Sequence, residues 1–155
     1  MSNEILYILL PDYAAHEAVY LSQAIASDEY ALKAHPLYVN KVVAPTLEPV
    51  RSIGGFRTLP DYSFDTVPDD YAALVLIGGF GWSTPVAECV MPIVKKAVEN
   101  GKIVGAICNG ASFLAKCGLL NNVRHTGNGP EQLQLWGGEN YTNPEGLSLI
   151  HISEP

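Results

Sequence analysis

The stretch Lys102-Ile-Val-Gly-Ala-Ile-Cys108-Asn-Gly-Ala-Ser-Phe-Leu-Ala-Lys116 decides the fold. Its apolar first half is typical of a buried strand, a helix is expected from about Gly110, and Cys108 stands at the bend. The residues around the bend are small: Gly105, Ala106, Gly110 and Ala111. A tight strand-to-helix elbow needs small residues, because bulky ones would clash where the helix folds back on the sheet. The stretch therefore predicts an α/β unit that exposes a cysteine.

Similar apolar runs recur along the chain and alternate with helical patterns. The predicted buried strands are Ile5–Leu10, Leu37–Ala44, Ala72–Ile77 and Ile103–Ile107, and the predicted helices are Glu17–Ser27 and Pro85–Asn100. Continuous apolar runs of this length are typical of strands covered on both faces, and strand–helix alternation implies right-handed crossovers. A Gly-Gly pair within 50–59 predicts a hairpin beside them. The fold class expected is α/β, with a doubly wound, mostly parallel, flavodoxin-like sheet.

Composition limits the functions to consider. The chain has 155 residues, 48% hydrophobic and 16% charged, which suits one domain with a single core. A net charge of −7 argues against binding nucleic acid or a membrane surface, because both need clustered cations. Three cysteines without metal-ligand spacing predict neither a disulfide framework nor a metal site. Without a signal peptide at the start, we expect a cytoplasmic protein.

The last nine residues, Leu147–Pro155, look like the translation of a transposon-end sequencing adapter. The competing interpretation is a natural apolar terminal strand. We expect the authentic domain to be residues 1–146 and the natural product to continue beyond them, so that the fold is truncated at its C-terminus. His151 lies in this suspect tail, whereas His16 and His35 are expected to be surface or packing residues.

Cys108 is the candidate reactive residue. The helix that follows it aims free N–H groups and its positive dipole end at the sulfur, which favours thiolate over thiol. An inert core cysteine is the alternative. Gly78 and Gly79 follow another predicted strand, at the edge where open α/β sheets bind ligands. Their backbone N–H groups, with that of Asn109, could form an oxyanion hole. A dinucleotide-binding G-x-G-x-x-G motif starting at Gly79 fails at its last position.

A third loop, after the first strand, carries Asp12 and Glu17. Glu17 would begin the first helix, from which a carboxyl group can reach a site shared by the other two loops. Burial beside a thiolate would favour the protonated acid and make it a proton donor. The alternative is an ordinary first-turn glutamate favoured by the helix dipole.

These three loops together resemble the ThiJ/PfpI superfamily, relatives of the class I glutamine amidotransferases. The matching parts are the opening strand ending in an acid, Val-Leu-Ile-Gly-Gly at 75–79, and Ala-Ile-Cys-Asn-Gly-Ala at 106–111. The resemblance implies that Cys108 is the nucleophile, that Glu17 contacts its sulfur, and that Asp12 is a less secure member of the pocket. Many members carry a His after the elbow helix. Here His125 is near in sequence, but a simple alignment places Gly127 or Asn128 at that position.

Three functions are compatible with these residues. The leading hypothesis is a cysteine-dependent enzyme, of hydrolase, glyoxalase or deglycase type, acting on a small molecule without a cofactor, with His125 as one candidate base. The second is a non-catalytic redox or stress sensor in which Cys108 is oxidised. The third is a glutamine amidotransferase. The resemblance also implies a homodimer.

Overall fold

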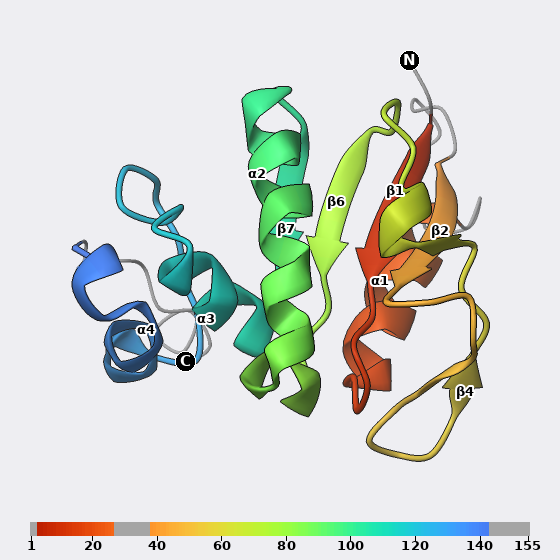
Figure 1. Ribbon diagram of the computed structural model, residues 1–155, viewed down its shortest axis with the longest axis horizontal. Helices are drawn as coiled ribbons and strands as arrows, with labels where there is room; N and C mark the ends of the chain where they lie inside the picture. Colours follow the sequence, from red (N-terminus) through yellow and green to blue (C-terminus); the bar gives the residue numbers. More distant parts are fainter. Residues whose placement is uncertain (1–2, 27–37, 143–155) are drawn as a thin grey trace.

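Five parallel strands form the central sheet of the computed structural model (Figure 1). They are β1 (Glu4–Ile8), β2 (Val39–Ala44), β5 (Tyr62–Ser63), β6 (Ala73–Leu76) and β7 (Ile103–Ala106), in the spatial order β5-β2-β1-β6-β7. The chain steps from β1 to β2 on one side and returns to β6 on the other. The strand order therefore reverses between β1 and β6, where open α/β sheets bind ligands at the carboxyl ends of their strands. The predicted fold class is confirmed.

The structure describes residues 3–26 and 38–142. The predicted strand residue Leu37, together with His35 and the tail Leu147–Pro155, lies outside these ranges. Within them, no helix has the length and apolar character needed to cross a membrane.

In residues 3–26 and 38–142, four α-helices and several shorter elements accompany the sheet. The α-helices are α1 (Ala15–Ala26), α2 (Met91–Glu99), α3 (Asn109–Lys116) and α4 (Pro130–Gly137), and the 3-10 turns are η1 (Phe64–Thr66), η2 (Phe80–Ser83), η3 (Pro85–Val90) and η4 (Gly138–Asn140). The predicted helix Pro85–Asn100 is thus divided into η3 and α2. Pro92 explains the break, because its ring lacks an N–H group and clashes with the preceding turn. The predicted hairpin is β3 (Val50–Arg51) with β4 (Arg57–Thr58).

Alternating side chains of β1 build a separate core on each face of the sheet. Leu6 and Ile8 face α2 and α3, where Phe113 is fully buried, and Figure 1 shows α2 crossing in front of β7. Tyr7 and its same-face neighbours form a second core with α1. This second layer is thin: α1 has no fully buried side chain, and Ile103 on the edge strand β7 is 72% exposed.

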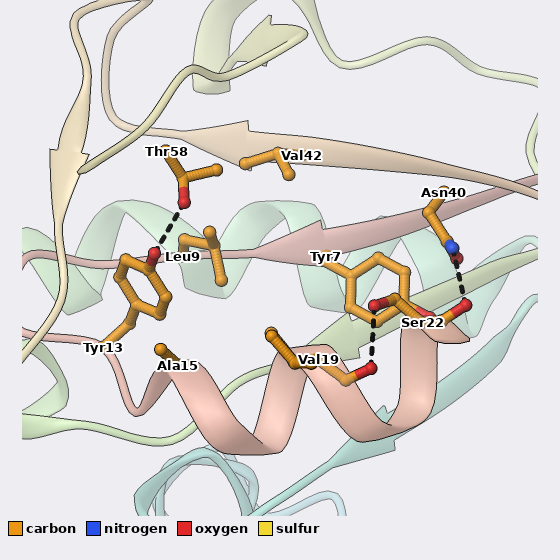
Figure 2. Close-up of a pocket in the computed structure, with 10 residues that line it drawn as sticks. Tyr7, Leu9, Tyr13, Ala15, Val19, Ser22, Asn40, Val42 and Thr58 are labelled. Carbon is orange, nitrogen blue, oxygen red and sulfur yellow. Dashed lines mark hydrogen bonds between the residues drawn. The ribbon is translucent and has the colours of Figure 1, made fainter. Parts of the chain in front are cut away.

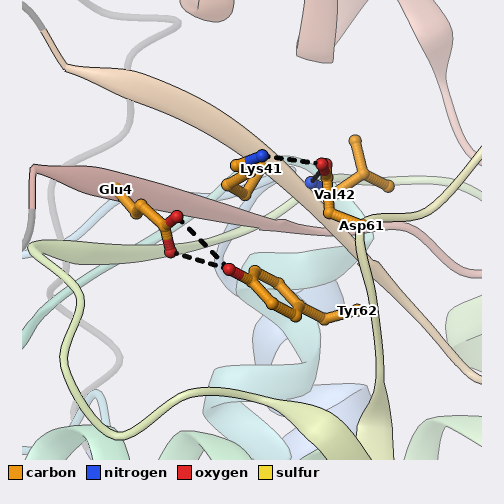
Figure 3. Close-up of polar contacts among 5 residues, drawn as sticks. All are labelled: Glu4, Lys41, Val42, Asp61 and Tyr62. Atoms are coloured by element: carbon orange, nitrogen blue, oxygen red, sulfur yellow. Dashed lines mark hydrogen bonds and ion pairs between the residues drawn. The ribbon is translucent and has the colours of Figure 1, made fainter.

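Polar contacts fasten the short edge strand β5 to the sheet (Figure 3). The Asp61 carboxylate accepts a hydrogen bond from the Val42 backbone N–H (2.8 Å) and pairs with Lys41 Nζ (2.9 Å). Tyr62 donates its hydroxyl to the Glu4 carboxylate at 3.1 Å. Asp61 raises the pKa of Lys41 through the shared hydrogen bond and charge. One acid thus satisfies both a backbone donor and a cation at the sheet edge.

Candidate active site

Cys108 lies at the elbow between β7 and α3 in a backbone conformation that non-glycine residues rarely adopt. Its φ of 54° and ψ of −122° cost about 1–3 kcal/mol, so surrounding contacts must hold them. The Ile107 N–H bonds to Leu76 O (3.0 Å) on one side, and the Ala111 N–H bonds to Cys108 O (3.0 Å) on the other. The strained turn anchors the sulfur at the carboxyl end of the sheet, as the sequence predicted for a strand-to-helix elbow.

Gly110 lets α3 start this close to the sheet. A Cβ atom there would lie 2.7 Å from Leu76 O, a distance that real Cβ atoms essentially never show, and 3.0 Å from Leu76 Cβ. Any side chain at this position would push α3 away from β6. Gly110 therefore lets the elbow lie close to β6, the strand that leads into the glycine loop at Gly78 and Gly79.

Gly78 marks the point where the acid and the cysteine converge. A Cβ atom built on Gly78 would lie 2.6 Å from Glu17 Oε2 and 2.7 Å from Cys108 Cβ. A methyl group at Gly78 would therefore clash with both side chains. This convergence of three loops is what the spacing of motifs along the chain predicts for the carboxyl edge of a parallel sheet.

Backbone hydrogen bonds bring Glu17 to this point. Ala14 N–H donates to Gly78 O (2.9 Å), and Tyr13 forms bridges to both Gly79 and Ser52 of the hairpin region. The first turn of α1 is thereby tied to the glycine loop, and Gly78 N–H donates to Glu17 Oε2 at 2.6 Å. The Gly78 N–H group, predicted as an oxyanion donor, instead holds the acid.

Amide side chains contact the sulfur and the loop at Gly78 and Gly79. Asn128 Nδ2 donates to Cys108 Sγ at 3.2 Å, and Asn109 Nδ2 donates to Gly79 O at 2.9 Å. Gln132, on α4, donates from Nε2 to Asn109 Oδ1 at 2.9 Å. Asn128 lies at one of the two positions that the alignment pairs with the family His. Gln132 was not among the predicted residues, because no local motif distinguishes it from an exposed helix position.

The structure does not bring His125 to the sulfur. Its Nδ1 bonds to Val123 O (2.9 Å), so this nitrogen carries the hydrogen, and Nε2 accepts from the Tyr141 hydroxyl (2.8 Å). Both ring nitrogens are engaged in a contact that joins the segment after α3 to the region after α4. His125 thus has a structural partner in place of the catalytic contact considered for it.

Asp12 contributes its backbone to the site, while the residue itself is exposed. Its φ is 58°, its N–H donates to Arg51 O (2.8 Å), and its carbonyl accepts from Phe80 N–H (3.0 Å). Asp12 therefore links the loop after β1 to the hairpin and to the loop at Gly78 and Gly79. These bonds give it a positioning role through the main chain.

The three cysteines lie in different surroundings. Cys89 is exposed on η3, Cys108 is partly exposed, and Cys117 ends α3. Burial raises the pKa of the Cys117 thiol to about 11, which keeps it protonated and unreactive at neutral pH. In the described parts of the chain, no three His, Cys, Asp or Glu side chains gather as a metal site would require.

Comparison with known families agrees with this geometry. The model of the DJ-1/PfpI family matches residues 3–146. The chain belongs to the DJ-1/PfpI family. A solved member of the DJ-1 superfamily from Agrobacterium tumefaciens superimposes with a TM-score of 0.75 at 30% identity, over 92% of this chain and 74% of that one.

Relatives of this DJ-1/PfpI protein are named for different activities. An uncharacterized protease of Bacillus subtilis is 38% identical over 123 residues, which cover 79% of this chain and 58% of that protein. A glutathione-independent glyoxalase of Caenorhabditis elegans is 31% identical over 75 residues, covering 47% of this chain and 40% of that protein. The chain thus spans little more than half of the first relative and less than half of the second.

Proposed function

We propose that this DJ-1/PfpI protein is a cysteine-dependent enzyme that acts on small reactive aldehydes of the glyoxal type. The observation that supports this most directly is the convergence of two side chains at Gly78. A Cβ atom placed on Gly78 would lie 2.6 Å from Glu17 Oε2 and 2.7 Å from Cys108 Cβ. A nucleophile and an acid that meet in this way can attack a carbonyl and exchange a proton in one site. The glyoxalase name of the nematode relative supports this substrate class.

The proposed reaction begins with addition. The Cys108 thiolate forms a C–S bond to the aldehyde carbon, the carbonyl π electrons move to oxygen, and Glu17 supplies the proton, which gives a hemithioacetal. Glu17, now a carboxylate, takes the proton from that carbon, and the adjacent carbonyl oxygen takes the proton of the hemithioacetal hydroxyl. Glu17 then returns its proton to the adjacent carbon, so that the enediol intermediate becomes a thioester with a hydroxyl group on the neighbouring carbon. Water hydrolyses the thioester, which releases a 2-hydroxy acid and regenerates the thiol. One acid that alternates between its two forms serves the addition and both proton transfers at carbon.

The groups beside the sulfur favour aldehydes over amides. Asn128 donates an amide N–H to Cys108 Sγ at 3.2 Å, and an amide can stabilise a thiolate but cannot take up its proton. Amide cleavage needs a base and then an acid for the poor leaving amine. Both nitrogens of His125 are bonded to Val123 and Tyr141. Aldehyde addition leaves no amine to expel and is therefore the less demanding chemistry for this site.

Turnover of glyoxal by the purified protein tests the proposal. Wild type should consume glyoxal and form glycolate, Cys108→Ser should abolish the reaction, and the Cys89→Ser control should retain it, because Cys89 is exposed and remote in the chain from the elbow. Equal turnover by wild type and Cys108→Ser would reject the proposal. Absence of turnover together with stoichiometric oxidation of Cys108 by dilute peroxide would instead favour the redox-sensor alternative.

A further inference from the structure

A chain of amide side chains leads from α4 to the elbow. Gln132 Nε2 donates to Asn109 Oδ1 at 2.9 Å, and Asn109 Nδ2 donates in turn to Gly79 O at 2.9 Å. Asn128 Nδ2, the donor on Cys108 Sγ, also lies 3.5 Å from Asn109 Oδ1. Asn109 is thus the centre of three contacts. The reaction proposed above gives Gln132, at the far end of this chain, no task.

A backbone carbonyl sets the direction of the amide chain. Gly79 O can only accept, so the Asn109 amide must turn its Nδ2 group towards it. Asn109 Oδ1 is then left to accept, and Gln132 supplies the donor through Nε2. A carboxylate or an apolar side chain of the same length offers no donor to this oxygen. The residue type at position 132 is therefore coupled to the orientation of Asn109.

The packing of α4 holds Gln132 in place. The next residue, Leu133, is only 3% exposed and belongs to the core that α3 shares. One turn later Gly137 lets α4 lie against α3, because a Cβ atom there would lie 3.2 Å from Ala115 O, and Figure 1 shows the two helices side by side. The Gln132 amide thus reaches Asn109 from a helix that is packed against the elbow helix.

The other side of the glycine loop is held by separate contacts. Tyr13 forms a bridge to Gly79, and its carbonyl accepts from Ile53 N–H at 3.0 Å. The Tyr13 hydroxyl shares a hydrogen bond of 2.6 Å with Thr58 Oγ1 of the hairpin (Figure 2). These bonds do not involve the amide chain. Loss of the contact from Asn109 should therefore free the elbow side of the loop and leave the hairpin side, and the fold, in place.

We propose that Gln132 is a positioning residue, which keeps the Asn109 amide on Gly79 O and thereby keeps the elbow attached to the glycine loop. The inference rests on the proposed function, because it takes Cys108 as the reacting group. Without the donor from Gln132, Asn109 Oδ1 loses its partner at 2.9 Å and the amide can turn towards solvent. The neighbouring Asn128, which donates to the sulfur, then loses the oxygen beside it.

A double-mutant cycle on Gln132 and Asn109 tests the proposal, with alkylation of Cys108 by iodoacetamide at pH 7 as the measurement. Gln132→Met keeps the length of the side chain and removes the donor. It should slow alkylation roughly 2- to 10-fold, as expected for the loss of one hydrogen bond. Asn109→Ala should slow it at least as much. Because Gln132 acts through Asn109, the double variant should react at the rate of Asn109→Ala alone.

The matched control is Gln134→Met on the same helix. Gln134 is exposed and its Nε2 donates to Gly138 O at 3.0 Å, so this variant loses one amide but no contact with the site and should react like wild type. Gln132→Glu is the second variant, for use if Gln132→Met does not fold. Its carboxylate attracts Asn109 Nδ2 and turns Oδ1 towards Gly79 O, so alkylation should again be slower, whereas Gln134→Glu adds the same charge without this effect.

Two results would overturn the proposal: a wild-type alkylation rate in Gln132→Met and Gln132→Glu, or additive losses in the cycle. Additive losses would mean that Gln132 acts independently of Asn109, by stabilising α4. The cycle does not depend on glyoxal, so absence of glyoxal turnover by wild type would reject the proposed function and leave this test intact. Where wild type turns over glyoxal, Gln132→Met should lower kcat and leave KM unchanged, because Gln132 acts on the elbow and not on the substrate.

Discussion

Replacing Glu17 with glutamine should separate the chemistry of the site from its folding. Glu17 Oε2 accepts a hydrogen bond from Gly78 N–H at 2.6 Å, and its carboxyl group faces the side chain of Cys108. Glutamine has the same shape, and its Oε1 can still accept from Gly78 N–H. What it loses is the ability to exchange a proton.

The effect of Glu17→Gln on stability should be much smaller than its effect on the rate of turnover. In the proposed resting state Glu17 is protonated, so the acid and its glutamine replacement both offer Gly78 N–H a neutral acceptor, and the free energy of unfolding should change by less than about 1 kcal/mol. For a chain of this length that shifts Tm by less than about 4 °C. Loss of general acid–base catalysis costs about 10²- to 10⁴-fold in rate. Glyoxal turnover should therefore fall far more than stability does.

The assay compares kcat for glyoxal and Tm by calorimetry in wild type, Glu17→Gln and Glu131→Gln. Glu131 is a matched control, because it also lies in the first turn of a helix, at the start of α4, and is exposed. It should change neither kcat nor Tm measurably. If Glu17→Gln keeps wild-type kcat, or if its loss of activity merely follows a large loss of folded protein, Glu17 is only a helix-start acid and the proton-transfer argument fails.

Four further outcomes follow from the same structure. Cys117 should react with iodoacetamide more slowly than exposed Cys89 at pH 7 and gain reactivity as pH rises towards its pKa of about 11; faster labelling of Cys117 at pH 7 would contradict this. Asn128→Ala should slow alkylation of Cys108 about 2- to 10-fold by removing the N–H donor on its sulfur, and an unchanged rate would exclude that role. A variant ending at Gly146 should melt at the temperature of the whole chain, since we propose that the following nonapeptide is not native; a large loss of Tm would make it real structure. Light scattering should show the two-fold dimer that the family resemblance implies, and a monomer at micromolar concentration would refute it.

Much of the architecture could be predicted from the sequence, because local patterns determine it. Continuous apolar runs located β1, β2, β6 and β7, although only β1 and β6 are buried on both faces. The small residues around Cys108 predicted the elbow. The hairpin followed from Gly54 and Gly55. The prediction missed the division of Pro85–Asn100, where a proline in the first turn of α2 separates it from the preceding 3-10 turn.

The side-chain partners within the site could be predicted only in part. The sequence predicted that Glu17 and Cys108 lie close together, because both follow strands that end at the same edge of the sheet. Asn128 and His125 could not be distinguished in this way, because the segment after α3 contains no periodic element and its path depends on tertiary contacts. The bond between His125 and Tyr141 joins residues 16 positions apart, and nothing in the local sequence indicates it. The partner of the Gly78 N–H group likewise depends on how α1 docks.

Stoichiometric alkylation of Cys108 tests the central claim most directly. Samples treated with increasing iodoacetamide are divided between a glyoxal turnover assay and peptide mass spectrometry of the three cysteines. We predict that residual activity equals the fraction of unmodified Cys108 at every point, whatever the state of Cys89 and Cys117. Turnover that persists when Cys108 is fully alkylated, or that disappears while Cys108 is still free, would contradict the account.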